Sequence, residues 1–212
     1  MVETQLRPRG ISDARVLNAF LRVPREDFFP DELRSFAYED AAFPIGGAQT
    51  VSQPYMVAIM TELLKLKGDE KVLEVGTGSG YQAAVLSALS HRVYTIERIV
   101  PLARKAREVV DDLGIANVDI LVGDGSRGWP ERGPFDRILT TAAAGEVPAS
   151  LLAQLREGGF FLGPVYNGSG EQEIIRLTRA GQEFRLERLR KCSFVPLVRG
   201  RPEGENAAKD TG

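Results

Sequence analysis

The stretch from Lys71 to Glu97 constrains the fold of this chain more than any other. An apolar run predicts a strand over 72–75, and a glycine-rich turn, an apolar helix and a second strand follow it. The three glycines of Gly76–Gly80 permit a tight bend and remove the Cβ atoms that would block a ligand. Glu97 ends the second strand about twenty residues beyond the turn, where a carboxylate can accept hydrogen bonds from both hydroxyls of a ribose. The stretch therefore predicts a βαβ unit that binds a nucleoside-containing cofactor.

The spelling of the turn distinguishes between cofactors. Dinucleotide-binding turns read G-x-G-x-x-G, and phosphate-binding loops continue with G-K-[ST]. This chain instead reads E-x-G-x-G-x-G over 74–80 and continues with Tyr81 and Gln82. That spelling resembles the first motif of class I methyltransferases, which use S-adenosylmethionine, a cofactor with a sulfonium and an ammonium but no phosphate. The cofactor-binding residues that the resemblance implies here are Glu74, Gly76, Thr77, Gly78, Ser79, Gly80 and Glu97.

Composition indicates which classes of protein to exclude. The 212 residues include 27 Lys and Arg against 29 Asp and Glu, so no basic field predicts a nucleic-acid partner. No apolar run approaches the roughly 20 residues of a membrane span, and the first ten residues lack the apolar core of a signal peptide. Cys192 is the only cysteine and His91 the only histidine, which favours a reducing cytoplasm and predicts no metal site.

Hydrophobic periodicity predicts strands that alternate with helices. One helix is expected over Ile11–Val23 with Ser12 as its cap, and an amphipathic helix over Pro54–Leu66, while Glu26–Thr50 reads as irregular. The remaining expected elements are, in order, strand 72–75, helix 80–89, strand 92–97, helix 100–113, strand 118–122, strand 135–140, helix 148–155 and strands 160–165, 171–179 and 183–190.

This order predicts an α/β fold of the Rossmann-like, class I methyltransferase type. We expect a mostly parallel, doubly wound sheet, with an antiparallel strand from a C-terminal hairpin. Residues 1–199 are expected to form one domain, in which 1–66 is a helical, substrate-side segment and 67–199 the cofactor-binding core with the C-terminal strands. Residues 200–212 are polar and lack periodicity, which predicts a disordered tail.

Segments on both sides of the glycine turn carry a more specific resemblance. Ala42–Pro54 reads AFPIGGAQTVSQP and is similar to the L-P-x-G-x-x-Q-T-[IV]-S-x-P of the protein-L-isoaspartate O-methyltransferases, with Phe43 and Ala48 in place of the usual leucine and glycine. Val72–Leu86 resembles the family's V-L-E-[IV]-G-T-G-S-G-Y-Q-A-A-V-L almost letter for letter. Further family-like segments are Val23–Pro30, Val122–Gly125, Gly128–Pro130, Thr141–Ala144 and Phe194–Leu197.

The resemblance implies a protein repair reaction. The family transfers a methyl group from S-adenosylmethionine to the free carboxylate of L-isoaspartyl residues, with D-aspartyl residues as an open alternative. The ester then cyclises to a succinimide. Because a carboxylic acid of pKa about 3.9 is ionised at neutral pH, the reaction needs placement of its reactants rather than a strong base. Isoaspartyl-containing proteins and peptides are the expected partners of a cytoplasmic enzyme, with a monomer favoured.

The resemblance also implies roles for single residues. Ser52 is the expected catalytic residue, although its position alone favours a cap on the helix that begins near Pro54. Asp124 and Gly125 are expected beside the adenine and Thr141 beside the cofactor, but Asp124 equally fits an Asx turn and Thr141 a loop cap. The expected substrate-binding residues are Thr50, Val51, Ser52, Gln53, Val195 and Pro196.

Two other classes of function are compatible with such a fold, a different methyltransferase and a non-enzymatic adaptor. A methyltransferase that acts on tRNA would be expected to show a basic face, and one that modifies a precursor peptide would need added recognition segments. A non-enzymatic adaptor that only keeps the fold would be expected to have lost the glycine turn, Glu97 or Ser52, and all of these are present. Arg25 and Glu26 are expected to tether the N-terminal segment.

Overall fold

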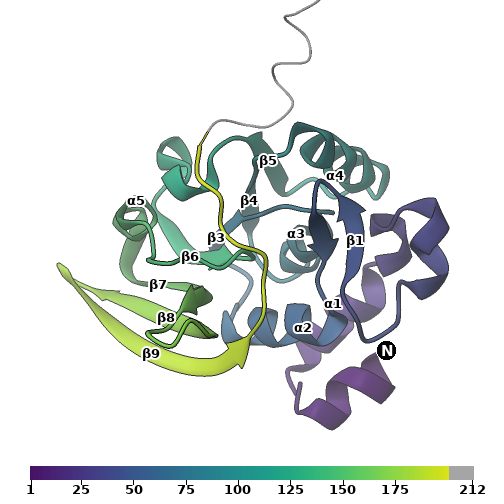
Figure 1. Ribbon diagram of the computed structural model, residues 1–212, viewed down its shortest axis with the longest axis horizontal. Helices are drawn as coiled ribbons and strands as arrows, with labels where there is room; N and C mark the ends of the chain where they lie inside the picture. The colour runs from purple at the N-terminus through teal and green to yellow at the C-terminus, as the bar shows by residue number, and fades with distance from the viewer. Residues whose placement is uncertain (201–212) are drawn as a thin grey trace, which may run out of the picture.

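The computed structural model describes residues 1–200, so the tail predicted over 200–212 lies, beyond Gly200, outside the described residues. A seven-stranded sheet with strand order β5-β4-β3-β6-β7-β8-β9 forms the centre of the molecule (Figure 1). The first five strands in this order are parallel, and β8 and β9 add an antiparallel hairpin at one edge. The strands are β3 (Lys71–Val75), β4 (Arg92–Glu97), β5 (Val118–Val122), β6 (Phe135–Thr140), β7 (Leu155–Tyr166), β8 (Gln172–Ala180) and β9 (Glu183–Cys192). The predicted fold class is confirmed.

Helices cover both faces of this sheet, because the side chains of each buried strand alternate between two cores. Val72 of β3 packs into a core shared with α1, α2 and α3, whereas Leu73 and Val75 pack into a second core on the opposite face with Leu151 of α5. The helices are α1 (Ala14–Arg22), α2 (Pro54–Leu63), α3 (Tyr81–Ser87), α4 (Val100–Asp112) and α5 (Ala149–Ala153). Short helical turns occupy Val2–Leu6, Arg7–Arg9, Arg25–Phe28, Asp31–Phe36, Gly125–Arg127 and Pro130–Arg132.

The start of α1 differs from the prediction. Asp13, not Ser12, caps this helix, and its side chain accepts a hydrogen bond from Arg15 N. The backbone N–H groups of Ser12 and Asp13 donate to the Glu62 carboxylate at 2.8 and 2.7 Å. A contact with α2, nearly fifty positions away in the chain, therefore decides the register of the cap, and local capping preference could not reveal it.

A small hairpin occupies the end of the segment predicted to be irregular. Strands β1 (Phe43–Gly46) and β2 (Gln49–Val51) pair antiparallel. The turn between them is left-handed at Gly46, Gly47 and Ala48, with φ values of 91, 57 and 55°. Ala48 is thus a non-glycine residue in the left-handed region, a conformation that costs about 1–2 kcal/mol in an L-residue. This strain gives a physical reason for a glycine at that position.

Helix α2 is apolar on nearly all sides rather than amphipathic. Tyr55, Val57 and Met60 are buried in the core, and Met56 and Ile59 are partly buried. The helix is apolar because one side packs against the core and another lines the pocket described below. A helix enclosed in this way does not show the one-sided pattern of a surface helix.

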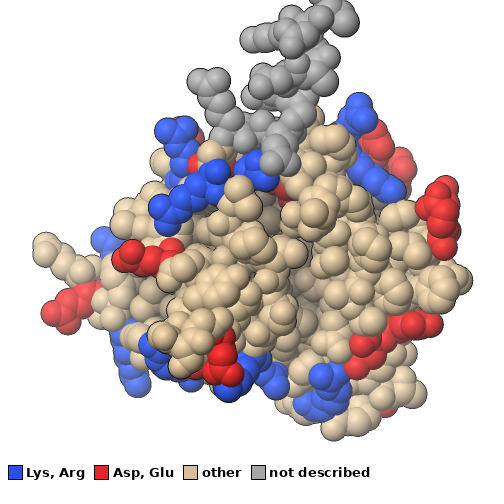
Figure 2. Space-filling view, viewed as in Figure 1, with Lys and Arg blue, Asp and Glu red and all other residues tan. Residues whose placement is uncertain are grey.

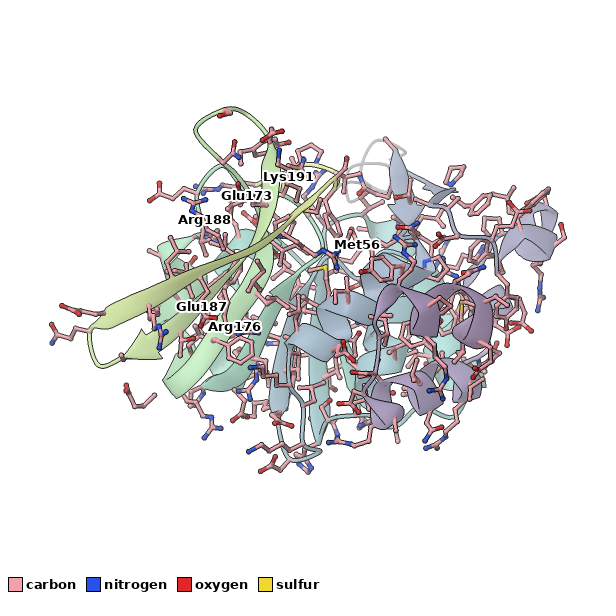
Figure 3. The ribbon with its side chains drawn as sticks, turned by 90° about the horizontal axis from the view of Figure 1, so that it is seen from below. Met56, Glu173, Arg176, Glu187, Arg188 and Lys191 are labelled. Carbon is pink, nitrogen blue, oxygen red and sulfur yellow. The ribbon has the colours of Figure 1, made fainter. Side chains whose placement is uncertain are left out.

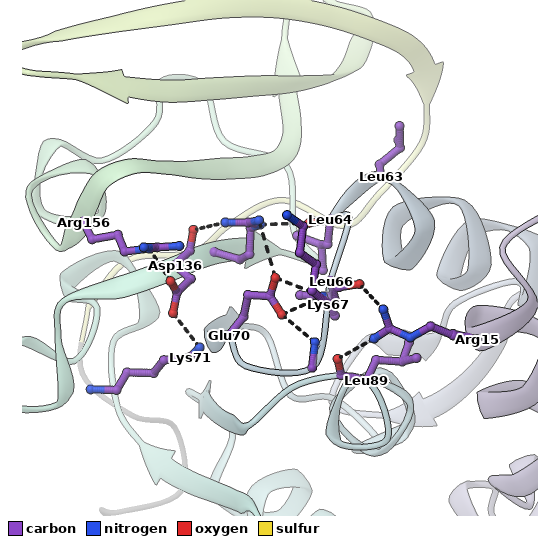
Figure 4. A network of polar contacts seen from close by, with 12 residues as sticks. Arg15, Leu63, Leu64, Leu66, Lys67, Glu70, Lys71, Leu89, Asp136 and Arg156 are labelled. Atoms are coloured by element: carbon purple, nitrogen blue, oxygen red, sulfur yellow. Dashed lines mark hydrogen bonds and ion pairs between the residues drawn. The ribbon is translucent and has the colours of Figure 1, made fainter.

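A polar network fixes the C-terminal end of α2 to the sheet (Figure 4). The Arg137 guanidinium donates to Leu64 O at 2.8 Å and lies 3.7 Å from the Glu70 carboxylate. Glu70 also accepts hydrogen bonds from Lys67 N and Gly68 N. Since a buried carboxylate is costly unless it is paired, this network makes one arrangement of the connection from α2 to β3 favourable.

The hairpin β8–β9 is lined with cross-strand ion pairs (Figure 3). Arg188 lies 2.8 Å from Glu173, and Lys191 lies 2.7 Å from the carboxylate of Glu171. Exposed pairs of this kind contribute little to stability. Charged side chains do, however, protect a sheet edge against pairing with another chain.

Strand β7 begins earlier than predicted, at Leu155 instead of residue 160, and α5 ends at Ala153. The pairing of β6 with β7 is irregular between Phe135 and Arg137, and Gly158 has a φ of 70°. A bulge therefore carries the strand through the Gly158–Gly159 pair, which the sequence reads as a break.

Gly163 of β7 offers a test of the packing beside the end of β6. A Cβ at this position would overlap Thr140 Oγ1 and lie 2.9 Å from Phe161 Cζ. We expect Gly163→Ala to lower the free energy of unfolding by about 1–3 kcal/mol, because a close-packed core cannot absorb the added volume. Gly168→Ala is the matched control, since a Cβ there meets nothing within 4 Å. Urea denaturation of both variants measures the difference, and equal stabilities would contradict the packing described.

Candidate active site

The glycine turn lies at the carboxyl ends of the central strands, as predicted. Gly76, Gly78 and Gly80 have φ values of 99, 55 and 90°, which favour glycine. A Cβ at Gly76 would overlap Thr141 Oγ1, and the Thr141 hydroxyl donates to Gly76 O at 2.7 Å. The residue after β6 thus fixes the turn after β3, and both line the same pocket.

Glu97 joins this turn to the next one. Its Oε2 accepts from Gly78 N at 2.8 Å, and its Oε1 accepts from Ile99 N at 2.9 Å. The side chain is buried yet lines the pocket beside the turn. Because a carboxylate oxygen accepts more than one hydrogen bond, both oxygens keep capacity for ribose hydroxyls.

Glu74 lies beneath the turn rather than in the pocket. It is fully buried, and its Oε2 accepts from the Thr95 hydroxyl at 2.6 Å. The Thr95 and Thr77 hydroxyls are 2.7 Å apart, so Thr77 is the donor of that pair when Thr95 donates to Glu74. Burial raises the pKa of Glu74 to about 8, which favours a neutral carboxyl. In this structure Glu74 supports Thr77, which does line the pocket.

Three hollows lie near the turn, and the inner one shares lining residues with each of the other two. An inner pocket is bounded by the glycine turn, Glu97, the end of β2 and α2. An adjacent pocket shares Glu97 and Gly76 with it and extends toward Gly125 and Ile99. An outer pocket shares its wall with the inner one and opens between Ala41 and Phe194. The predicted residues that line the inner pocket are Thr50, Val51, Ser52, Gly76, Thr77, Gly78, Ser79, Glu97, Thr141 and Val195, and Gln53 lines the outer pocket.

Ser52 lies in the wall between the inner and outer pockets and lines both. It does not cap α2, because Gln53 occupies the N-cap position and Pro54 begins the helix without a side-chain cap. Within residues 1–200 its hydroxyl makes no hydrogen bond, whereas its carbonyl accepts from Arg25 at 2.7 Å. The structure therefore favours the interpretation of Ser52 as a pocket residue over the alternative of a helix cap.

The segment after β9 crosses the carboxyl ends of the sheet (Figure 1). Ala143 N donates to Val195 O at 2.8 Å, and Leu197 N donates to Ala143 O at 2.7 Å. Gln172 pairs with the backbone of Phe194 at both N and O. This segment forms one side of the inner and outer pockets at Phe194 and Val195, whereas Pro196 lines the adjacent pocket beside Gly125.

Two predicted contacts to the adenine have local structural roles. Asp124 forms an Asx turn, in which Oδ1 accepts from Ser126 N at 2.9 Å. Its other oxygen, Oδ2, accepts from the distant Gly200 N at 2.9 Å. Burial alone would raise the pKa of Asp124, but the hydrogen bonds from Ser126 and Gly200 hold it below its usual value. A Cβ at Gly125 would overlap Val75 Cγ1, so close packing against β3 already requires glycine there. Gly125 does line the adjacent pocket.

Several lining residues could not be assigned from the sequence. Met56, Val57 and Met60 of α2 and Gln82 of α3 line the inner pocket, and Ile96 and Ile99 line the adjacent one. Apolar residues at such spacing read as core, and only tertiary packing shows that one side of α2 is open to a pocket. One indication of such a role is present in the sequence, because Met56 lies in the first turn of α2, close to Ser52 in the chain.

Other kinds of site are not seen within the described chain. Over residues 1–200, no group of three or more His, Cys, Asp or Glu side chains is placed to hold a metal ion. None of the helices in that range combines the length and the apolar character that crossing a membrane requires.

Comparison with known proteins decides the family. The model of the family described as protein-L-isoaspartate(D-aspartate) O-methyltransferase matches residues 1–202. The chain belongs to this family. Among its similar relatives are the protein-L-isoaspartate O-methyltransferases of Geobacter metallireducens, 52% identical over 93% of this chain and 92% of the relative, and of Parvibaculum lavamentivorans, 55% identical over 92% of this chain and 89% of the relative.

Solved structures of protein-L-isoaspartate O-methyltransferases share the fold. One matches with a TM-score of 0.84 and 32% identity, and the match covers 95% of this chain and 67% of that one. Another, described as the Plasmodium falciparum enzyme in complex with S-adenosyl-L-homocysteine, matches with a TM-score of 0.82 and 26% identity over 94% of this chain and 97% of that one.

Glu74→Gln tests the buried carboxyl beneath the turn. Between pH 4.5, the usual pKa, and about 8, the folded protein keeps the Glu74 proton while the unfolded chain releases it. The free energy of unfolding therefore falls as pH rises through this range, and glutamine removes that fall. We expect urea denaturation at about pH 5 and about pH 8 to show a larger loss for the unmodified protein than for Glu74→Gln. Equal losses in the two proteins would contradict the assignment.

Proposed function

We propose that the inner and adjacent pockets hold S-adenosylmethionine, the cofactor of this family. Glu97 is the only charged residue that lines the inner pocket within residues 1–200, so this pocket suits a ligand with a sulfonium and an ammonium. The Glu97 carboxylate would bind the ribose hydroxyls. The apolar lining by Ile96 and Ile99, with Gly125 nearby, supports the adenine in the adjacent pocket. The residues present therefore fit the cofactor.

The outer pocket is the proposed site of the protein substrate, an L-isoaspartyl residue with its free carboxylate. The observation that carries this assignment is the position of Ser52 and Thr50, which line both the inner and the outer pocket. A carboxylate bound in the outer pocket would therefore lie next to the inner one. Family membership supports isoaspartyl residues as the substrate, and D-aspartyl residues are a second proposed substrate.

The chain's own residues act by orienting the reactants and excluding water. When bound, S-adenosylmethionine supplies a methyl group activated by the sulfonium. The Ser52 hydroxyl would donate to one oxygen of the ionised carboxylate and leave the other to face the methyl. Met56, Phe194 and Val195 give the shared wall an apolar lining that limits water. Since the carboxylate loses charge as the ester forms, a moderate donor such as a hydroxyl suits the reaction better than a cation.

The peptide backbone is the proposed feature by which substrates are held. Within residues 1–200, Val195 N makes no hydrogen bond, although its carbonyl is bound by Ala143. An extended peptide can pair with such a backbone group without any reading of its side chains. This property suits an enzyme that accepts damaged sites in many sequences.

Proteins rather than nucleic acids are the proposed partners. Figure 2 shows Lys, Arg, Asp and Glu side chains around the rim of one face, whose central part is uncharged and hollowed. No continuous basic surface lies on that face, and a nucleic-acid site would be expected to have one. We also propose a monomer in the cytoplasm, a location that the single cysteine supports.

Paired peptides test the proposed function directly. Two peptides that differ only in an aspartyl or an isoaspartyl linkage are incubated with the enzyme and labelled S-adenosylmethionine. We expect methylation of the isoaspartyl peptide and none of its aspartyl partner, because only the former presents a free α-carboxylate on a side branch. Equal labelling of both peptides, or labelling of tRNA alone, would refute the proposal.

Ser52→Ala tests the role of the hydroxyl. We expect kcat for the isoaspartyl peptide to fall on the order of 10²-fold, the scale for loss of one oriented donor. Affinity for S-adenosylhomocysteine should persist, because the glycine turn is held by Glu97 and Thr141. Ser87→Ala, which removes a serine hydroxyl bonded within α3, is the control with normal turnover. Full turnover per folded molecule in Ser52→Ala would end the assignment.

A further inference from the structure

We propose that Arg25 is a positioning residue for methyl transfer, which holds Ser52 and the start of α3 in a fixed relation. This inference rests on the proposed role of Ser52. It goes beyond the tether expected from the sequence, because it assigns Arg25 an effect on turnover.

Arg25 is fully buried, and its donors are directed at two separate loops. Its Nε donates to Ala37 O, and its Nη2 donates to Ser52 O, both at 2.7 Å. The guanidinium lies 4.6 Å from the centre of the Tyr81 ring and 5.2 Å from that of Phe29. One side chain therefore contacts the substrate-side segment and the first residue of α3.

The bond to Ser52 O acts on the direction of the Ser52 side chain. Ser52 lies between Val51, the last residue of β2, and Gln53, the N-cap of α2. The hydrogen bond to the Ser52 carbonyl restricts rotation of the backbone between β2 and α2. The Cα–Cβ bond of Ser52 is thereby held in place, in a residue that lines both the inner and the outer pocket.

The contact with Tyr81 connects Arg25, and through it Ser52, to the cofactor side of the pocket. Tyr81 follows Gly80 directly, lines the inner pocket and is itself buried against Phe20 and Phe28. The distance between the Ser52 loop and the glycine turn is therefore set through Arg25. In-line transfer depends on that distance, since a displacement of about 1 Å can lower a rate on the order of 10²-fold.

The charge of Arg25 is costly where it lies. Within residues 1–200, no carboxylate lies within ion-pair distance of Arg25, and its buried Nη1 has no partner. Burial lowers the pKa of this guanidinium from its usual value. An apolar side chain would pack here without that penalty but could not direct hydrogen bonds at two carbonyls. Arginine is thus suited to this position by the directions of its hydrogen bonds rather than by its charge.

Arg176 provides a matched control at the other end of α2. It too is buried, lies 4.8 Å from the centre of the Phe160 ring, and donates to a backbone carbonyl, Leu63 O, at 2.8 Å, although it also lies 3.3 Å from the Glu187 carboxylate. Its Nε is a buried donor without a partner, as is Nη1 of Arg25. Neither arginine lines any of the three pockets, but Arg25 contacts Ser52 and Tyr81, which do.

The experiment compares Arg25→Met, Arg25→Lys and Arg176→Met with the unmodified full chain. Melting curves give the folded fraction, calorimetry gives the affinity for S-adenosylhomocysteine, and labelled methyl transfer gives kcat and KM for the isoaspartyl peptide. We expect Arg25→Met to lower kcat per folded molecule on the order of 10²-fold with unchanged S-adenosylhomocysteine affinity. Arg25→Lys should recover part of this loss, because an ammonium can still donate to one carbonyl. Arg176→Met should lower the melting temperature and keep kcat.

The results separate the inference from the proposed function. An unmodified enzyme that fails to methylate the isoaspartyl peptide would refute the proposed function itself. If it is active, normal kcat in the folded Arg25 variants would overturn the positioning role. An equal loss of kcat in Arg176→Met would also overturn it, because general loosening would then explain the effect. So would an Arg25→Lys protein that does not fold, because Arg25 would then serve stability alone.

Discussion

The hydrogen bonds from Gly78 N and Ile99 N to the Glu97 carboxylate are the contacts on which the site depends. They join the turn after β3 to the turn after β4, two neighbouring parallel strands whose carboxyl ends meet at one edge of the sheet. With the Thr141 bond to Gly76 O from the end of β6, three strand ends become one rigid rim. The pocket and its acid are thus properties of the sheet rather than of a flexible loop.

The site also contains two buried ionisable groups that are costly to place there. Glu74 is a fully buried carboxyl beneath the turn, and Arg25 is a fully buried guanidinium behind Ser52. Burial opposes the charge of each group, and it shifts the pKa of Glu74 upward and that of Arg25 downward. Glu74 is linked to the pocket residue Thr77 through Thr95. Arg25 contacts the pocket residue Ser52 directly. Energetically unfavourable features that gather at one place in a fold are typical of a functional site.

The parts of the fold that local sequence controls were predictable. Glycines with positive φ and apolar runs of strand length placed β3, the turn and β4 correctly, and the acid at the strand tip lies in the predicted pocket. The parts that distant contacts control were not. The Asp13 cap depends on Glu62, and the pocket lining by Met56 depends on how α2 packs. The contacts of Glu74 with Thr95 and of Asp124 with Ser126 and Gly200 belong here too, because a motif specifies residue types but not which groups their side chains contact.

Ser52 illustrates the boundary between the two kinds of information. Capping preference alone favours a helix cap for Ser52, whereas family resemblance assigns it to catalysis. The structure separates the roles, because Gln53 and Pro54 begin α2 and leave the Ser52 side chain in the wall between two pockets. Its alignment then depends on a segment that precedes it by more than twenty residues, through the Arg25 bond to its carbonyl.

A crystal structure of the enzyme with S-adenosylhomocysteine and an isoaspartyl peptide would show directly whether Glu97 and Ser52 have the proposed roles. We expect ribose hydroxyls on the Glu97 carboxylate and the isoaspartyl carboxylate in the outer pocket, with one oxygen within hydrogen-bond distance of Ser52 Oγ. Its other oxygen should face the cofactor sulfur across the shared wall. A peptide carboxylate bound away from Ser52, or a ribose bound away from Glu97, would contradict the roles proposed for these residues.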